Sequence, residues 1–206
     1  MDLEGFRDGA QVVLRIRPAH GPDQLVLTMA GCVGLLGVSA AGFSVLVNAL
    51  PQVPARPSGV PVAIVTRLAL AAANAAEATA IICEAPHATG QHYLVTGPDS
   101  ISSHECSSAA VVAVMPDSKR LWHTNHPLVG YLTDDDDAES DARWEAVRPV
   151  MGLPGWGRRR TRELLEAPPV CRALNGLAAY TFAAAVVEQR ASGRPELWVT
   201  HGPPVA

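Results

Sequence analysis

The N-terminal quarter of the chain alternates between short apolar runs and turns rich in glycine or proline. Segment 11–17 ends in LRIR, whose alternating side chains have the period of a half-exposed strand. After a turn signal at 20–23, two segments rich in valine and leucine follow at 25–31 and 42–50, joined by the glycine-rich sequence GCVGLLGVSAAG. This pattern predicts a meander of buried strands.

A different composition begins after a proline-rich loop. Prolines recur through residues 51–61, and proline cannot donate to a strand ladder. Segments 62–72 and 75–85 then consist mainly of alanine, leucine and isoleucine, with few charges. Because alanine and leucine are strong helix formers, we expect two buried helices that are separated near Asn74.

Strand signals return in the middle of the chain. Segments 91–97, 107–115 and 120–126 carry these signals, and Pro-Asp turn signals stand at 98–99 and 116–117. Turn signals at such regular spacing indicate an antiparallel meander.

The C-terminal part adds helices and a final pair of strands. Helical spacing covers 141–150 and 161–166, and segments 178–189 and 196–202 form a predicted hairpin. The order of strands, helices, strands, helices and strands indicates an α+β fold rather than alternating βαβ units. We expect residues 1–206 to form a single domain, arranged as a helix–sheet–sheet–helix sandwich.

Charged residues are scarce and nearly balanced. Hydrophobic residues make up 48% of the chain and charged residues 17%, with a net charge of -4 at pH 7. Such a balance gives no overall attraction to nucleic acid or anionic lipid, so neither is an expected partner. The uncharged run 25–55 is long enough to span a bilayer, but glycines, polar residues and two prolines interrupt it, which favours buried strands over a membrane helix.

The cysteines and the N-terminal sequence suggest a cellular compartment. Cys32, Cys83, Cys106 and Cys171 lack CxxC spacing and the density of a disulfide scaffold, which favours reduced thiols. The acidic sequence MDLEGFRDGA has neither the basic start nor the apolar stretch of a signal peptide. We therefore expect a cytoplasmic protein.

A polar cluster with the sequence HTNH lies at 123–126, where a predicted strand ends before a proline. A zinc site would need two further ligands, and no suitable pair is present in the sequence, so no metal is expected. The Asn125 carboxamide could donate a hydrogen bond to a developing oxyanion. The alternative is a polar cluster at a strand end whose hydrogen bonds are satisfied within the protein.

A second candidate amide, Asn48, lies within the apolar sequence GFSVLVNAL. Burial of an unpaired amide costs about 1–3 kcal/mol, so Asn48 needs a hydrogen-bond partner. Two alternatives remain open: the side chain caps the turn before Pro51, or it points into a cavity.

Three other features carry no predicted chemistry. Cys106 follows His104 and Glu105, but neighbouring strand residues face opposite sides, so the three do not form a triad. The acidic run 134–137 lacks the glycine and terminal glutamate of a calcium loop, which indicates a solvated loop. The glycines in 31–42 open no helix and therefore give no dinucleotide fingerprint, so no cofactor is expected.

Several motifs occur in order along nearly the whole chain: TMAGCVGLLGVSAAGFSVLVNAL, SGVPVAIVTRLAL, GQHYLV, SHECS, LWHTNHPL and LWVTHGPP. Together they resemble the aminopenicillanic-acid acyltransferase family of N-terminal-nucleophile (Ntn) hydrolases, relatives of choloylglycine hydrolases. The resemblance implies a four-layer αββα fold with antiparallel sheets, autoproteolytic release of an N-terminal cysteine, and cleavage or transfer of an acyl group at an amide bond. It also implies a small-molecule amide or acyl-thioester substrate.

The resemblance assigns roles to three residues by position. Asn125 matches the active-site asparagine of the family, and Asn48 matches the asparagine associated with the oxyanion hole. Asp2 matches the aspartate that steers the amine and thiol of the nucleophilic cysteine. A free α-amine with a pKa of about 8 can act as base for its own thiol, while the two amides stabilise the oxyanion.

The chain departs from the family pattern in two places. Ser39 stands where the family usually has asparagine, and only Met1 precedes Asp2, whereas the family has its nucleophilic cysteine and strand before this aspartate. We therefore expect a partial domain that lacks the first, nucleophile-bearing strands. The predicted unpaired sheet edge would promote aggregation, self-association or binding of the missing segment.

Three hypotheses for the function follow. The chain belongs to an amidohydrolase or acyltransferase whose N-terminal segment is encoded upstream, or it is a catalytically inactive remnant that retains an acyl-ligand pocket. In the third hypothesis, the chain is cleaved between Gly31 and Cys32, and Cys32 becomes the nucleophile. We do not expect that cleavage, because Cys32 lies within a strand connection.

Overall fold

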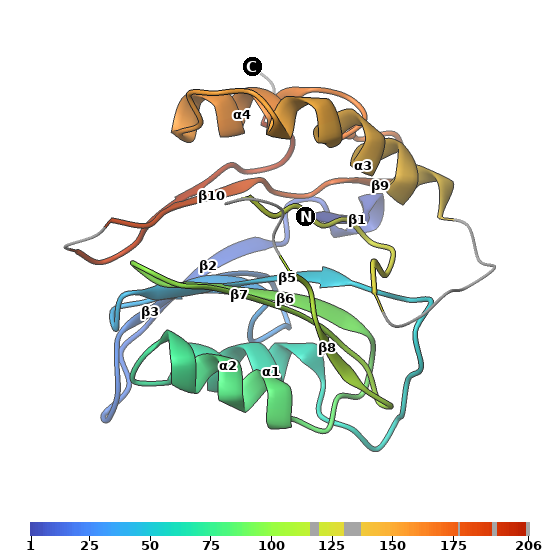
Figure 1. Cartoon of the computed structure of the whole chain (residues 1–206). Coiled ribbons are helices and arrows are strands. Elements are labelled where there is room, and N and C mark those ends of the chain that lie inside the picture. Colours follow the sequence, from blue (N-terminus) through green and yellow to red (C-terminus); the bar gives the residue numbers. More distant parts are fainter. Residues whose placement is uncertain (116–119, 130–136, 177, 191–192, 205–206) are drawn as a thin grey trace.

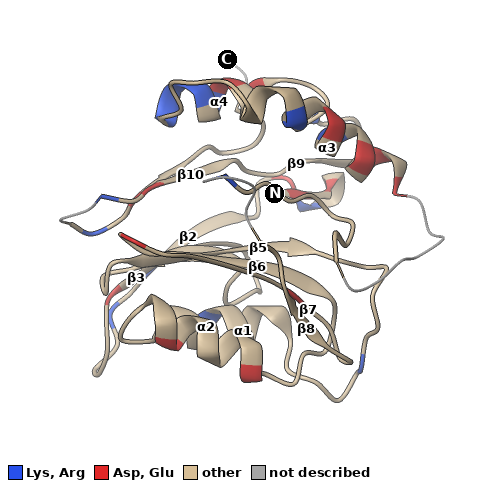
Figure 2. Cartoon of the chain, in the orientation of Figure 1, with Lys and Arg blue, Asp and Glu red and all other residues tan. Residues whose placement is uncertain are grey.

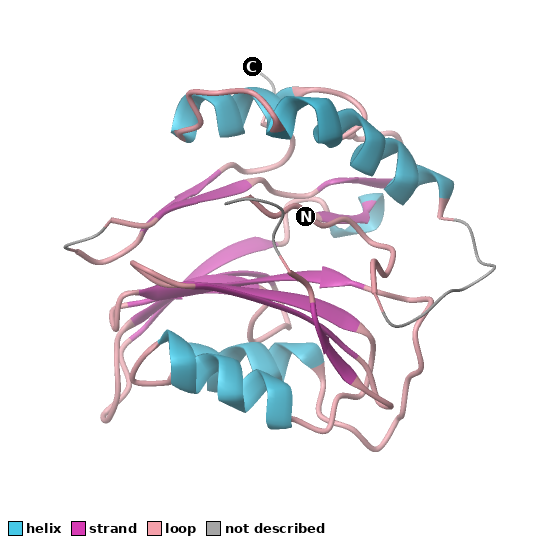
Figure 3. Cartoon of the chain, in the orientation of Figure 1, coloured by secondary structure: helices cyan, strands magenta, loops and turns pink. Residues whose placement is uncertain are grey.

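The computed structural model describes residues 1–115, 120–129, 137–176, 178–190 and 193–204. Its elements form four layers (Figure 1): a pair of helices, a seven-stranded sheet, a second layer of strands and a further pair of helices. Coloured by secondary structure, the α-helical layers lie outside the strands (Figure 3). The expected α+β fold, an αββα sandwich with antiparallel sheets, is confirmed.

The outer helices are α1 (Val62–Leu70) and α2 (Ala75–Glu84) on one side and α3 (Ala138–Met151) and α4 (Arg158–Glu166) on the other. The seven-stranded sheet consists, in spatial order, of β2 (Gln11–Ile16), β3 (Gln24–Met29), β4 (Leu36–Ser39), β5 (Phe43–Ala49), β6 (Gln91–Thr96), β7 (Ile101–Cys106) and β8 (Val111–Ala113). The second strand layer contains two antiparallel pairs, β1 (Asp2–Glu4) with β9 (Ala179–Thr181) and β10 (Ala185–Glu188) with β11 (Glu196–Val199).

The large sheet is an antiparallel meander, as the turn signals predict, but it contains a strand that we interpreted as a connection. This strand, β4, lies inside the glycine-rich sequence between β3 and β5. A Cβ atom on Gly37 would lie 2.4 Å from the carbonyl oxygen of Leu25 and 3.0 Å from a methyl carbon of Leu70. Gly37 is therefore present for close packing of β3 and α1 against β4, and not to form a turn.

Two predicted strand positions near the middle of the chain are wrong. The segment predicted to be a strand at 107–115 begins with a turn, closed by a hydrogen bond from Ser107 N to Ala110 O, and only β8 within it is a strand. The preceding β7 has the polar sequence ISSHEC, which lacks the apolar alternation of a typical strand. Segment 120–126 contains no strand, and the backbone N–H of Asn125 donates to the Ser140 side chain instead of to a strand.

The helices agree with the prediction, and side-chain caps explain the starts of α2 and α3. Asn74 begins α2: its Oδ1 accepts from the backbone N–H of Glu77, while the Glu77 carboxylate accepts from Ala73 N, both at 2.9 Å. On the opposite side of the molecule, Asp137 accepts from Ser140 N, so α3 starts before the predicted 141.

The predicted C-terminal hairpin is confirmed for β10 and β11. Its first part is separate, because β9 pairs with β1 and not within the hairpin. The turn signal at 116–117 and the acidic residues 134–136 lie outside the described residues. No helix in the described ranges is both long and apolar enough to cross a bilayer.

Two apolar cores separate the layers. One lies between α1, α2 and the large sheet, and the other lies between the two strand layers around Leu27, Tyr180, Phe182 and Ala183. Charged residues gather on α3 and α4 and in loops, while the inner strands carry few (Figure 2). The space between the strand layers is thus mainly apolar, and polar groups within it require partners.

We predict that the core between the strand layers contributes strongly to stability. Phe182 is 0% exposed, so Phe182→Ala should lower the free energy of unfolding by about 3–5 kcal/mol. Phe6 is 65% exposed, and Phe6→Ala should cost about 1 kcal/mol or less. Urea denaturation of both variants measures this difference, and equal losses would contradict the assigned core.

Candidate active site

A row of polar side chains crosses three strands of the large sheet. Asn48 of β5, His92 of β6 and Glu105 of β7 are direct cross-strand partners. Tyr93 and Cys106, the next residues along β6 and β7, belong to the core on the side of α1 and α2. Since strand side chains alternate between faces, the polar row faces the second strand layer.

His92 determines how the Asn48 amide is oriented. Its Nδ1 lies 3.2 Å from Asn48 Oδ1, and its Nε2 lies 2.8 Å from the Ser103 hydroxyl. Burial, reinforced by the nearby His123 and His104, lowers the pKa of His92 to about 2, so the ring is neutral. A neutral imidazole has one N–H, and the amide oxygen can only accept, so Nδ1 donates to Asn48 and Nε2 accepts from Ser103.

This arrangement leaves one end of Asn48 without a partner. Its Oδ1 is engaged by His92, and its Nδ2 group has no hydrogen-bond partner in the described part of the chain. Of the two alternatives for Asn48, capping of the turn before Pro51 is wrong, because the side chain bonds across the sheet. The structure thus presents a fixed amide donor at the C-terminal end of β5.

A buried contact between His123 and Glu105 lies on the same row. The His123 ring stacks on His92, with centroids 3.8 Å apart and planes at 6°, and its Nε2 lies 2.8 Å from Glu105 Oε1. The side chains of His123 and Glu105 are only 2% and 1% exposed. The same carboxylate accepts the backbone N–H groups of Leu128 at 2.5 Å and Val129 at 3.2 Å.

Asn125 lies beside Asn48 and uses both ends of its amide. Its Nδ2 donates to Ala49 O at 3.0 Å, and its Oδ1 accepts from Arg143 of α3 at 3.0 Å. Its backbone N–H donates to the Ser140 hydroxyl at 2.7 Å. The structure therefore brings together two of the three residues that the resemblance assigns.

The third residue, Asp2, lies in the second strand layer. Its Oδ1 accepts from the Thr181 hydroxyl at 3.0 Å, and its Oδ2 lies 4.0 Å from Arg172. Arg172 also forms two shorter bonds, of 2.7 and 3.1 Å, to Glu139. Asp2 thus makes its recorded contacts with β9 and Arg172, and it is not in hydrogen-bond contact with Asn48 or Asn125.

A cavity of about 310 Å³ lies beside α3. It is lined by Ala138, Glu139, Ala142, Arg143, Pro169, Cys171 and Arg172. Because Arg143 bonds to Asn125 and Arg172 approaches Asp2, this cavity has a site residue on each side.

Three of the four cysteines lie in environments that raise the thiol pKa. Burial raises the pKa values of Cys83 and Cys171, and it raises the pKa of Cys106 to about 12. Cys32 lies in the turn after β3, with its sulfur 3.8 Å from the carbonyl oxygen of Gly34. Activated thiols have lowered pKa values, so Cys83, Cys106 and Cys171 are unsuited as nucleophiles.

The histidines of the HTNH cluster bond to protein groups. His126 Nδ1 lies 2.9 Å from the Ser140 hydroxyl and 3.2 Å from Asp141, while His123 bonds to Glu105. Within the described ranges, no group of three or more potential ligands is arranged to hold a metal ion.

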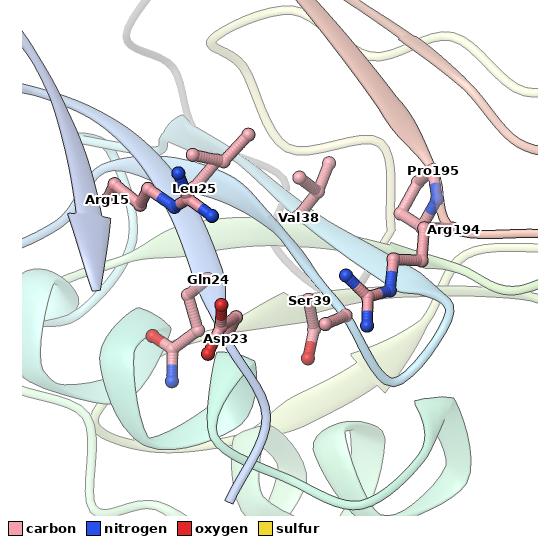
Figure 4. A pocket seen from close by; sticks show the side chains of 9 residues that line it. Arg15, Asp23, Gln24, Leu25, Val38, Ser39, Arg194 and Pro195 are labelled. Carbon is pink, nitrogen blue, oxygen red and sulfur yellow. The ribbon is translucent and has the colours of Figure 1, made fainter. Parts of the chain in front are cut away.

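A second cavity, of about 230 Å³, lies at the opposite end of the large sheet over Leu25 and Val38 (Figure 4). Ser39 lines this cavity and pairs with Phe43 at the start of β5. Five residue steps separate Phe43 from Asn48, which is about 17 Å along a strand. Ser39 therefore does not belong to the candidate active site.

Several residues of this site were not predicted from the sequence, namely His92, Ser103, Glu105 and Arg143. The available signal was the polar character of β7 within an apolar sheet. That signal becomes informative only with the register, which places Glu105 opposite His92 and His92 opposite Asn48.

We predict that the buried histidine makes stability depend on pH. The pKa of His92 is lower in the folded than in the unfolded chain, so between about pH 2 and 6.5 only the unfolded chain binds its proton. Stability should be complete above about pH 6.5 and fall below it by up to about 1.4 kcal/mol per pH unit from this group. His87 and His104, whose pKa values burial also lowers, add in the same direction.

Urea denaturation between pH 7.5 and 5 measures this dependence. His92→Gln should flatten it, whereas His20→Gln at an exposed position should leave it unchanged. Equal slopes for His92→Gln and the unaltered protein would contradict the neutral, buried assignment.

Comparison with known proteins assigns the chain to a family. The family described as acyl-coenzyme A:6-aminopenicillanic acid acyl-transferase matches residues 23–145. A curated relative, the acyl-coenzyme A:6-aminopenicillanic-acid-acyltransferase 40 kDa form of Emericella nidulans, is 30% identical over 112 residues. The aligned part is 53% of this chain and 31% of the relative, so the chain spans about a third of the relative's length.

The chain is similar to solved structures to different degrees, and one of them shares its fold. The Caenorhabditis elegans ortholog of N-acylethanolamine-hydrolyzing acid amidase superposes with a TM-score of 0.60 and 16% identity, covering 82% of this chain and 80% of the other. Penicillin V acylase from Agrobacterium tumefaciens gives a TM-score of 0.38, with 16% identity over 81% of this chain and 52% of the other. The family match covers more than half of the chain, and the chain therefore belongs to the acyl-coenzyme A:6-aminopenicillanic acid acyl-transferase family.

Proposed function

We propose that these residues form the acyl-binding and oxyanion-stabilising part of a cysteine Ntn amidohydrolase or acyltransferase, with a small-molecule amide or acyl thioester as substrate. One observation carries the proposal: His92 holds the oxygen of the Asn48 amide and leaves its NH2 group free to donate. Family membership supports the class of reaction, and the E. nidulans relative is by name an acyltransferase for 6-aminopenicillanic acid.

In this mechanism Asn48 stabilises the charge that develops during acyl transfer. A thiolate adds to the carbonyl carbon of the substrate, and the carbonyl oxygen becomes an oxyanion. Asn48 Nδ2 donates to that oxyanion, and His92 prevents the amide from turning its oxygen toward the same charge. The intermediate then collapses and expels the amine or thiol of the substrate, which takes up the proton that the α-amine of the cysteine removed from the thiol. The acyl group stays on the cysteine until water or an acceptor amine attacks it and releases the thiol again.

Asn125 has a different role in this proposal. Both ends of its amide are occupied, by Ala49 O and by Arg143. It therefore braces the end of β5 next to Asn48, whereas Asn48 is the oxyanion donor. The cavity beside Arg143 is the space that we assign to the substrate.

The nucleophile of this mechanism lies outside these 206 residues. Burial raises the pKa values of Cys83, Cys106 and Cys171, which opposes thiolate formation. We assign the reaction to a cysteine in a preceding segment, whose α-amine serves as its base and which Asp2 helps to steer. Cleavage before Cys32 would instead appear in intact-mass spectra as the loss of 31 residues.

A second candidate function is binding of an acyl ligand without catalysis. The raised thiol pKa values of Cys83, Cys106 and Cys171 favour it when the 206 residues act alone. The two functions differ in what precedes Met1 in the gene.

Translation of the upstream DNA and assay of the extended protein separate these functions. The extended protein should hydrolyse N-acyl amides or transfer acyl groups from acyl-coenzyme A, while residues 1–206 alone should not. If the upstream reading frame contains no cysteine-led strand, or if the extended protein is inactive, the binding function replaces the catalytic one.

In the extended enzyme, we predict that Asn48→Ala lowers kcat about 10²–10³-fold, because it removes an oxyanion donor. Asn175→Ala, at an exposed position that is not among the residues lining the cavity, is the matched control and should leave kcat unchanged. Steady-state kinetics with one N-acyl amide measure both variants. A loss of less than about threefold for Asn48→Ala would remove Asn48 from the oxyanion hole.

A further inference from the structure

We propose that Glu105 is a positioning residue that holds segment 123–129, and with it Asn125, at the end of β5. This inference rests on the proposed function for its catalytic meaning, but its structural basis is independent. Glu105 accepts three N–H groups from the segment: His123 Nε2 at 2.8 Å, Leu128 N at 2.5 Å and Val129 N at 3.2 Å.

The segment needs such an acceptor because it contains no helix or strand. Its backbone N–H groups have no ladder to join, and a buried N–H without a partner is destabilising. A carboxylate offers two oxygens with several acceptor positions, so one side chain satisfies Leu128, Val129 and His123 together. In return, these donors stabilise a carboxylate whose side chain is only 1% exposed.

The two hydrogen-bond partners of His123 require a shared proton at its contact with Glu105. Its Nδ1 lies 2.7 Å from the carbonyl oxygen of Thr124, which can only accept, so Nδ1 carries a hydrogen. The contact of Nε2 with Glu105 Oε1 then requires a second proton between these two atoms. His123 and Glu105 together therefore hold one more proton than a neutral imidazole and an ionised carboxylate would hold.

The anchor also reaches the Asn48 amide. The His123 ring, held by Glu105, stacks on the His92 ring at 3.8 Å, and His92 in turn donates to Asn48 Oδ1. One carboxylate thereby supports both candidate amides: Asn125 through the segment, and Asn48 through two stacked rings.

Glu105 acts through these neighbours and not on substrate. Its side chain is almost completely buried, and its two oxygens already accept from three N–H groups of the protein. A direct acid–base role would require those bonds to break.

Hydrogen exchange of the unaltered chain gives the first test. The amides of Leu128 and Val129 should exchange as slowly as those of Tyr93 and Val95 in β6, although they lie outside any helix or strand. Fast exchange at Leu128 and Val129 would overturn the proposal without any mutation.

Glu105→Gln gives the second test, with Glu84→Gln at an exposed helix end as the matched control. The glutamine NH2 group replaces one acceptor with a donor, so exchange at Leu128 and Val129 should accelerate at least 100-fold relative to β6, and the control should match the unaltered chain. Equal acceleration at all amides, or none, would overturn the anchor. If Glu105→Gln does not fold, the hydrogen exchange of Leu128 and Val129 in the unaltered chain tests the anchor by itself.

Kinetics of the extended enzyme connect the anchor to catalysis. Glu105→Gln should lower kcat about 10–100-fold with KM within about threefold, as expected when a supporting residue is lost. An unchanged kcat despite faster exchange at Leu128 would overturn the positioning role. The extended protein could also show the expected exchange at Leu128 and Val129 and yet have no activity. That result would support the anchor and would count only against the proposed function.

Discussion

A carboxylate buried between two sheets is stable only where hydrogen-bond donors surround it. The arrangement of this site follows from the donors that surround the Glu105 carboxylate. Its donors come from residues 18 to 24 positions further along the chain, so segment 123–129 must pass directly over β7. Asn125 lies within that segment, and the His123 ring covers His92. The positions of both candidate amides thus derive from the same electrostatic requirement.

Much of the fold is predictable from the sequence because its signals are local. The capping box at Asn74 and Glu77 and the apolar strands each depend on residues a few positions apart. The unpredicted strands β4 and β7 depend on distant partners instead: Gly37 in β4 is required by Leu70 of α1, and the polar sequence of β7 is stabilised by a segment that follows it.

The candidate site was predictable only in part for the same reason. Motif resemblance identifies Asn48 and Asn125, and the structure brings them together through Ala49. Their different hydrogen bonding, one amide with a free end and the other with none, depends on His92 and Arg143, which are distant in sequence. No periodicity in a single segment contains that information.

The division of the second strand layer into two short pairs has a dynamic consequence. In the large sheet, every strand except the two at its edges is bonded on both sides, whereas each strand of the second layer has one partner. Native proteins open locally where hydrogen bonding and packing are sparse, so the second layer is expected to open at a lower free energy than the meander beneath it. Small molecules could then reach the space between the sheets through sub-global opening of one side, while the polar row on β5, β6 and β7 keeps its geometry throughout.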